Sequence, residues 1–398
     1  MIDGTEEPRR GTLHSTSYVR TANAAQIVRL LRDRGAMSRA ELVRASGLTK
    51  PTVTAIVKSL LHDGVVIESG TSPSSANGRP ERGGRPGSLV WFNGEARTAV
   101  AARVGLQLEL THVTAEGAAL AEEAFPMTWD PDPLLEMVVR EIRRLTGPSG
   151  ALSSVALTVP GFIDHHAGTV TFPPYGWDRV PMQSTLEDGL GVPVSLLSLP
   201  SAAVVGEIIS GAAADHEDAV LVFLSQGIGA GILSRGRLLV GAGGAVGELG
   251  HCPVSSGLQC LCGRRGCLET VAAGWAVRAE AAALLGRREL AHASLSQLED
   301  LHDPRIDDVL GRAASALGAA TAWLVNLLDP SIVILGDTRF TRGAGSFFEA
   351  FDEATRQYAV PGEVKIVRGT PDARLRGTVQ GALELLPEPL RPRLTVCA

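Results

Sequence analysis

The chain of 398 residues is long enough for two or three domains, each with its own hydrophobic core. Hydrophobic residues make up 44% and charged residues 20%, which is ordinary for a globular protein, and no segment reaches the roughly 20 uninterrupted apolar residues of a membrane helix. The polar first twenty residues lack the pattern of a signal peptide, so we expect a cytoplasmic protein.

Charge is divided unevenly along the chain. Residues 21–91 carry ten Lys or Arg against five Asp or Glu, although the formal net charge of the whole chain is -6. A basic segment on an acidic body favours a polyanionic partner for that segment, although an imbalance of this size also arises by chance.

Residues 21–92 predict a winged helix-turn-helix, preceded by a flexible tail over residues 1–20. Apolar residues recur at helical spacing from Asn23 to Arg34. Ser38 and Glu41 have the spacing of a capping box that opens a second helix. A glycine-containing turn over residues 45–47 then leads to a third helix, capped by Thr49. The buried face of this third helix consists of Val53, Ile56, Val57 and Leu60.

The opposite face of the third helix predicts contacts to double-stranded DNA. Its polar residues are Lys50, Thr52, Thr54 and Lys58. Such side chains suit phosphates and base edges in a major groove, although any solvated helix face carries short polar residues. Because one short helix reads too few base pairs to specify a site, we expect a homodimer or homotetramer.

A hairpin wing is expected after the third helix. Residues 65–68 and 89–92 predict its two strands. The loop between them contains Gly-Arg-Pro twice, a sequence that can present Arg79 and Arg85 to a narrow minor groove. A basic, flexible linker is the alternative interpretation of this loop.

Residues 93–398 predict an α/β body with two lobes and a ligand cleft between them, because strands and helices alternate. Strands are expected at 99–104, 107–114, 155–159, 220–224 and 332–335. Helices are expected at 133–146, 201–212, 270–285 and 308–328.

Four metal-ligating residues lie close together in the body. They are His251, Cys260, Cys262 and Cys267. One imidazole and three thiols suit a closed, structural Zn²⁺ site, and the intervening glycines let the loop curl. Cys252 is a less suitable ligand because adjacent side chains rarely converge on one ion. A redox switch is the competing interpretation.

The segment GELGHCPVSSGLQCLCGRRGCLE, which ends at Glu269, resembles the signature of the ROK family of repressors, open reading frames and sugar kinases. The order of winged helix, Gly-Arg-Pro loop and zinc loop is that of the family's transcriptional repressors. The resemblance implies a two-lobed actin-like (ribonuclease H-like) fold and Zn²⁺ bound by the four residues above. It also implies a sugar pocket lined by Gly161, Glu248, His251 and Glu269. His251 can serve both sites, because an imidazole has two ring nitrogens.

Departures from the family pattern predict that kinase chemistry is lost. Leu199 occupies the position of the family's catalytic aspartate, and leucine cannot accept a proton. The first phosphate loop begins with Arg103 where the family has aspartate. Residues 225–229 lack the usual hydroxyl of the second phosphate loop, and residues 336–338 read Gly-Asp-Thr in place of a Gly-Gly pair. We therefore expect no catalytic residues.

Together these features predict a cytoplasmic, nucleoid-associated transcription regulator of carbohydrate-related genes, most simply a repressor. Its effector is expected to be a sugar or sugar derivative, although a regulator without effector remains an alternative. Trp177 could stack on a sugar ring, although such a tryptophan more often belongs to the core. The alternatives for function are a sugar kinase with a DNA-binding appendage and a ligand-free, constitutive DNA-binding scaffold.

Overall fold

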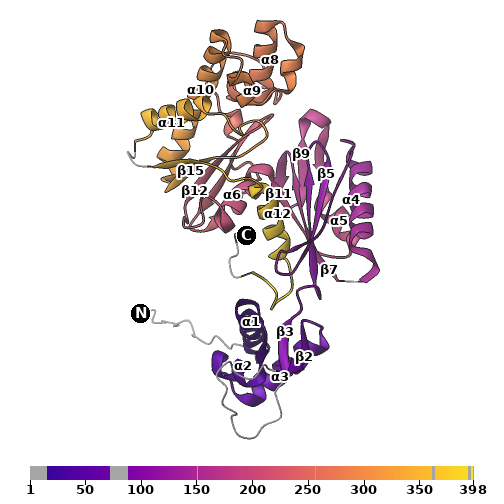
Figure 1. Cartoon of the computed structure of the whole chain (residues 1–398). Helices are drawn as coiled ribbons and strands as arrows, with labels where there is room; N and C mark the ends of the chain where they lie inside the picture. The colour runs from indigo at the N-terminus through magenta and orange to yellow at the C-terminus, as the bar shows by residue number, and fades with distance from the viewer. Residues whose placement is uncertain are drawn as a thin grey trace, which may run out of the picture. The chain divides into compact units, whose positions relative to one another are not determined.

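The computed structural model describes residues 16–71, 88–149, 151–255, 257–360, 364–392 and 396–397. The chain forms two compact units (Figure 1). One consists of Met1–Arg97 together with Leu386–Arg391, and the other of Thr98–Leu385 together with Pro392–Ala398. Within the described ranges, none of the helices combines the length and the apolar character that crossing a bilayer requires.

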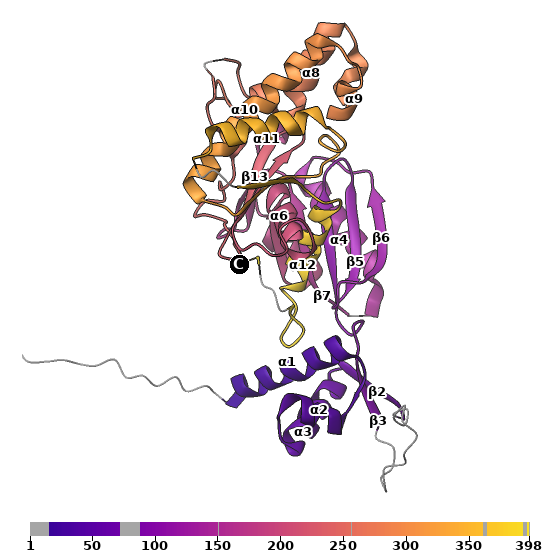
Figure 2. The same ribbon diagram turned by 60° about the vertical axis from the view of Figure 1, so that its left-hand side comes forward.

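Over its described residues, the smaller unit contains three helices and a three-stranded antiparallel sheet (Figure 2). Its elements are α1 (Thr16–Arg34), β1 (Met37–Ser38), α2 (Arg39–Ser46), α3 (Lys50–His62), β2 (Val66–Thr71) and β3 (Ser88–Phe92). The sheet order is β1-β3-β2, with Ile67 opposite Trp91 in the hairpin. This arrangement confirms the predicted winged helix-turn-helix.

Local sequence signals account for the helices of this unit. The Ser38 hydroxyl accepts a hydrogen bond from the Glu41 backbone N–H, and the Glu41 carboxylate accepts one from the Ser38 N–H, so the capping box forms as predicted. Helix α1 begins at Thr16, seven residues before the predicted start at Asn23. The end of the expected tail is therefore helical, because residues 16–22 contain no proline or glycine to stop the helix.

The larger unit is built on two five-stranded sheets. The first has the order β11-β7-β4-β5-β6 and the second β14-β13-β12-β15-β16. The strands of the first sheet are β4 (Thr98–Val104), β5 (Leu108–Thr114), β6 (Ala119–Phe125), β7 (Leu152–Val159) and β11 (Val194–Ser198). Those of the second are β12 (Ala219–Leu224), β13 (Ile228–Ser234), β14 (Arg237–Leu238), β15 (Ile332–Leu335) and β16 (Lys365–Arg368). A small antiparallel sheet contains β8 (Phe162–Asp164), β9 (Thr169–Phe172) and β10 (Trp177–Val180).

Helices cover both sheets and separate them. In Figures 1 and 2, α6 and α12 lie side by side between the sheets, while α4 and α5 cover the other face of the first sheet. The helices are α4 (Pro131–Thr146), α5 (Met182–Leu190), α6 (Leu199–Ser210), α7 (Glu269–Ala272), α8 (Gly274–Leu285), α9 (Leu295–Glu299), α10 (Pro304–Leu328), α11 (Ser346–Tyr358) and α12 (Ala373–Leu383). This arrangement confirms the expected two-lobed, actin-like body.

Parallel pairing brings the functional loops to one edge of each sheet. In the first sheet β4, β7 and β11 run parallel, so the chain after each of them leaves at the same edge. In the second sheet β12, β15 and β16 also run parallel. The loops that start at residues 225, 336 and 369 therefore share an edge. In open α/β folds, ligands bind at such carboxyl-end edges.

Candidate functional site

Helix α3 carries the four residues predicted to contact DNA. Lys50, Thr54 and Lys58 are exposed, and Thr52 is half-buried. The Thr52 hydroxyl lies 2.8 Å from that of the cap residue Thr49, and the Thr54 hydroxyl donates to the Lys50 carbonyl at 2.8 Å. Both threonine hydroxyls therefore form hydrogen bonds within α3 and its cap. The two lysines form no ion pair with any described residue, so their charges face solvent.

One basic residue near this surface was not predicted from the sequence. Arg44 is exposed in the last turn of α2, the helix that precedes the turn. The signal that could have identified it is a cation at the carboxyl end of the first helix of a helix-turn-helix, a segment that can cross the DNA backbone. Arg79 and Arg85 lie in the stretch 72–87, outside the described residues.

The four predicted zinc ligands converge in the second lobe. His251 ends a short 3-10 helix, and the cysteines follow on a loop that two isolated bridges hold together. Gly263 and Gly266 have φ values of +86° and +76°, a region that favours glycine, so the loop curls as expected. The four ligand atoms all lie within 4.8 Å of one another.

The spacing of these atoms fits a tetrahedral zinc ion. With Zn–S bonds of about 2.3 Å, thiolates at two corners of a tetrahedron lie about 3.8 Å apart. Here Sγ of Cys262 lies 3.6 Å from Sγ of Cys267, and Sγ of Cys260 lies 3.7 Å from Nδ1 of His251. Burial raises the pKa of the Cys260 thiol, and that of Cys267 to about 12, so their ionisation requires a compensating cation. The donor set therefore suits Zn²⁺.

The second nitrogen of the His251 ring faces a carboxylate. Nε2 lies 3.8 Å from Oε2 of Glu248. Burial, and secondly the charge of Glu269, raise the pKa of Glu248 to about 7. Glu269 is buried, and its Oε1 accepts a hydrogen bond from the Ile228 N–H at 2.8 Å. This bond anchors the turn between β12 and β13 and leaves the other oxygen of Glu269 as the available acceptor.

Gly161 lies in the turn that follows β7. Its φ is +101°, and an added Cβ would lie 2.5 Å from the Thr171 carbonyl oxygen, so only glycine fits here. The turn brings the Phe162 ring to a centroid distance of 6.3 Å from the His251 ring. Phe162 was not predicted from the sequence, because an apolar residue in a short strand gives no signal of a site.

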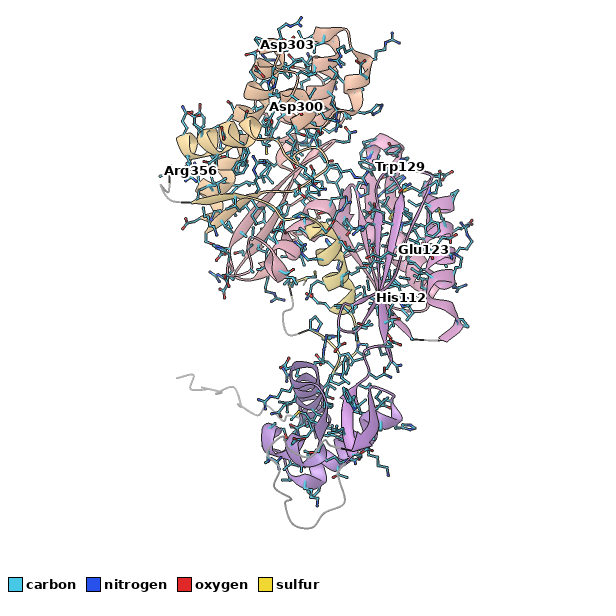
Figure 3. The ribbon with its side chains drawn as sticks, in the orientation of Figure 1. His112, Glu123, Trp129, Asp300, Asp303 and Arg356 are labelled. Atoms are coloured by element: carbon cyan, nitrogen blue, oxygen red, sulfur yellow. The ribbon has the colours of Figure 1, made fainter. Side chains whose placement is uncertain are left out.

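Trp177 belongs to the core, the more common of its two predicted places, and is not exposed for stacking on a ligand. Its side chain is 1% exposed, and its indole N–H donates to the Trp129 carbonyl at 2.6 Å. Figure 3 labels Trp129, which lies at the end of the first sheet far from His112. The Tyr175 ring stacks on Trp129 with a centroid distance of 4.1 Å. Trp177 is buried because the rings of Trp129 and Phe172 pack against it and the Trp129 carbonyl accepts its N–H.

Leu199 lies at the carboxyl-end edge of the first sheet, as the first residue of α6. Ser198 caps this helix by accepting a hydrogen bond from the Ser201 N–H at 3.2 Å. In the second lobe, Asp337 follows β15 and forms an ion pair with Arg342 at 2.5 Å. Because leucine is apolar, the half-buried Leu199 side chain offers neither a proton acceptor nor a hydrogen bond at the carboxyl-end edge of the first sheet.

A helix-turn-helix unit joined to a two-lobed, kinase-like unit with a His/Cys cluster defines the class of this chain. The ROK family model matches residues 103–387, and the IclR helix-turn-helix domain model matches residues 21–68. The chain belongs to the ROK family. This finding confirms the resemblance inferred from the segment around the zinc loop.

Similar proteins include regulators and kinases. The chain is 28% identical to the xylose repressor of Bacillus subtilis (strain 168) over 80% of this chain and 83% of that protein. It is also 28% identical to the DNA-binding transcriptional repressor Mlc of Escherichia coli (strain K12), over 86% of this chain and 87% of that protein.

Two solved structures extend the comparison. A ROK family transcriptional regulator, described as a homolog of E. coli MLC, has a TM-score of 0.71 and 26% identity, covering 92% of this chain and 97% of that chain. A ROK hexokinase from Thermus thermophilus has a TM-score of 0.60 and 28% identity, covering 72% of this chain and 97% of that chain. The regulator thus matches nearly the whole chain, and the kinase a smaller part of it.

Proposed function

We propose that this protein is a DNA-binding transcription regulator of carbohydrate-related genes, acting as a repressor, whose kinase-like body senses a small ligand without phosphorylating it. The main support for the proposal is that Leu199, at the first turn of α6, occupies the position of the family's catalytic aspartate. The same chain also has a helix-turn-helix. A body without a general base can still bind a ligand and change shape. Residues 21–92 would form the DNA-binding domain and residues 93–398 the sensor.

Contacts to DNA would come from α3 and the wing. The exposed charges of Lys50 and Lys58 suit phosphates, whereas Thr52 and Thr54 suit base edges once their local hydrogen bonds are exchanged. Arg79 and Arg85 would add contacts in the minor groove. Two winged helices in a homodimer, or pairs of them in a homotetramer, would read a two-fold operator in nucleoid DNA.

The zinc ion would be structural. His251 through Nδ1, Cys260, Cys262 and Cys267 would hold it, and with four protein ligands it leaves no open position for water. The ion would supply rigidity to the loop that carries His251 and Glu248. Gly161, Glu248, His251 and Glu269 would then form the ligand-binding side of the body, with Phe162 against the His251 ring.

Footprinting of the full chain on DNA upstream of its own and adjacent genes tests the proposal, alongside an ATP-coupled assay with a panel of hexoses. We expect protected sites and no turnover. Turnover that is lost on Glu248→Gln would instead establish a sugar kinase with a DNA-binding appendage. Protected sites that no sugar or sugar phosphate alters, together with no thermal shift by these compounds, would establish a constitutive scaffold.

A further inference from the structure

Two arginines from distant segments of the chain meet at one carboxylate beside β4, and the charge of a third, Arg339, also acts on one of them. Arg103 lies near the carboxyl end of β4, Arg339 follows β15, and Arg374 lies in the first turn of α12. The Nη2 and Nε atoms of Arg103 lie 2.8 and 3.0 Å from Oε2 of Glu109, its cross-strand neighbour on β5. Nη2 of Arg374 lies 4.0 Å from the same oxygen. One carboxylate oxygen thus faces two guanidinium groups.

The positive charge of this group, hereafter the arginine site (Arg103, Arg339 and Arg374), exceeds what Glu109 neutralises. Among the described residues, Arg339 has no ion pair, and the guanidinium of Arg374 has no hydrogen-bond partner. The Arg374 side chain is nevertheless only 33% exposed. Burial first, and then the charge of Arg103, lower the pKa of Arg374; the charge of Glu109 acts in the opposite direction, and Arg339 adds a smaller lowering effect.

Cross-strand pairing within the sheet accounts for the position of Arg103 beside Glu109, but it does not account for the position of Arg374. Arg103 and Glu109 are direct partners in the β4–β5 hairpin, and such pairs stabilise many sheets. Arg374 comes from a distant part of the chain, and its first-turn position aims it at a carboxylate that is already paired. A half-buried guanidinium without hydrogen bonds, held near two further cations, costs free energy that an additional anion would offset.

The chemistry of the arginine site selects an oxyanion with several acceptors. Guanidinium forks bind phosphate through two parallel hydrogen bonds, whereas a neutral sugar hydroxyl uses only one. The backbone of α12 adds to this preference, because its N-cap residue Asp372 makes no side-chain capping bond and the positive end of the helix dipole lies beside Arg374. Arg103 also replaces the aspartate that begins the phosphate loop in family kinases, so a positive charge stands where a carboxylate would be.

We propose that the arginine site binds the phosphoryl group of a small phosphorylated metabolite without a divalent metal, and that the effector of this regulator is such a metabolite. The effector role rests on the proposed function, whereas the binding site does not. The arginines would take the place that a Mg²⁺ ion occupies between carboxylate and phosphate in an enzyme. A change in the separation of β4, α12 and the loop after β15 would then accompany binding, because each segment contributes one arginine.

Calorimetric titration of the full chain, with no added magnesium, tests this proposal. The probes are glucose 6-phosphate, ADP, inorganic phosphate and glucose. We expect at least one of the two phosphorylated compounds to bind more tightly than inorganic phosphate and than glucose. Arg374→Gln should weaken that binding about tenfold or more. Arg374→Lys should restore part of it, because the charge returns without the planar fork.

Arg312→Gln on α10 is the matched control, because Arg312 is exposed and paired with Glu280 and Asp308 away from the arginine site. It should bind like the wild type. Equal binding by the wild type and Arg374→Gln, binding of inorganic phosphate alone, or no binding of any phosphate compound at millimolar concentration would overturn the proposal. Footprinting of the ligand-free wild type tests the DNA-binding function separately, and Arg374→Gln should leave that footprint intact.

Discussion

Nε2 of His251 lies 3.8 Å from a carboxylate oxygen of Glu248, while Nδ1 of the same ring lies 3.7 Å from the sulfur of Cys260. The two ring nitrogens of this imidazole thus lie next to two different groups. A metal bound at Nδ1 fixes the orientation of the ring and hence the direction of Nε2. Under the proposed function, metal binding and ligand recognition would therefore be joined through this single side chain.

This geometry predicts different outcomes for the two residues. His251→Gln should lower the zinc content well below one ion per chain, because it removes a metal donor. Glu248→Gln should keep the zinc content near one, because its carboxylate lies next to Nε2 and not next to Nδ1. Metal analysis of both purified variants by mass spectrometry checks this expectation. Loss of zinc from Glu248→Gln would show that the carboxylate, and not the imidazole alone, holds the ion.

Cys262→Ser should lose zinc and several kcal/mol of stability, because the free energy of binding a structural metal is folding free energy. The measurements are zinc content and the midpoint of thermal unfolding. Cys252→Ser is the matched control, since Cys252 lies next to His251 but outside the group of four. A zinc-replete Cys262→Ser, or a disulfide between Cys262 and Cys267 in the purified wild type, would favour the redox interpretation instead.

Lys58→Ala should weaken DNA binding and lower its dependence on salt. For duplex DNA the slope of log K against log salt falls by about 0.9 for each phosphate contact that is lost. Binding measured at several salt concentrations by fluorescence anisotropy provides this slope. Arg29→Ala is the control, because Arg29 is an equally exposed cation on α1. If the two variants have the same slope as the wild type, α3 does not contact the DNA backbone through Lys58.

Acid should destabilise the winged helix through its capping box. The hydrogen bonds from the backbone and side chain of Ser38 hold the pKa of Glu41 below its usual value of 4.5. A depressed folded-state pKa gives stability that is present above the unfolded value and is lost as pH falls through the folded one. Ser38→Ala should cost about 1 kcal/mol at neutral pH and reduce the loss of stability below pH 4.5.

Denaturant unfolding of the full chain labelled with fluorotryptophan, followed by the ¹⁹F NMR signal of Trp91, measures this effect between neutral pH and pH 3. Arg39→Ala serves as a comparison, because it removes an ion pair with Glu68 in the same unit without touching the cap. A Ser38→Ala variant with the wild-type pH profile would mean that the Ser38 hydroxyl does not contribute to the acid sensitivity of the cap.

The sequence revealed those features whose physical cause is local. The Ser38–Glu41 capping box and the four predicted zinc ligands lie within short segments, so spacing alone predicts that each set comes together. Strand β6 (Ala119–Phe125) was not predicted from the sequence, because an edge strand with exposed and half-buried residues lacks an apolar run. Trp177 and Arg374 depend on contacts with distant segments, and no spacing in the sequence could place them.

The turn after β7 offers a final test of how the backbone positions the site. Gly161→Ala places a Cβ 2.5 Å from the Thr171 carbonyl oxygen, at a φ of +101°, and should cost about 3 kcal/mol or more, because backbone atoms must move. Gly176→Ala also has a positive φ, +72°, but its Cβ meets no atom within 4 Å, so it should cost only about 1 kcal/mol. Denaturant unfolding of both variants measures the difference. Because β8 begins at the next residue, Gly161→Ala should also displace Phe162 from the His251 ring, and equal stability of the two variants would mean that the turn relaxes without strain.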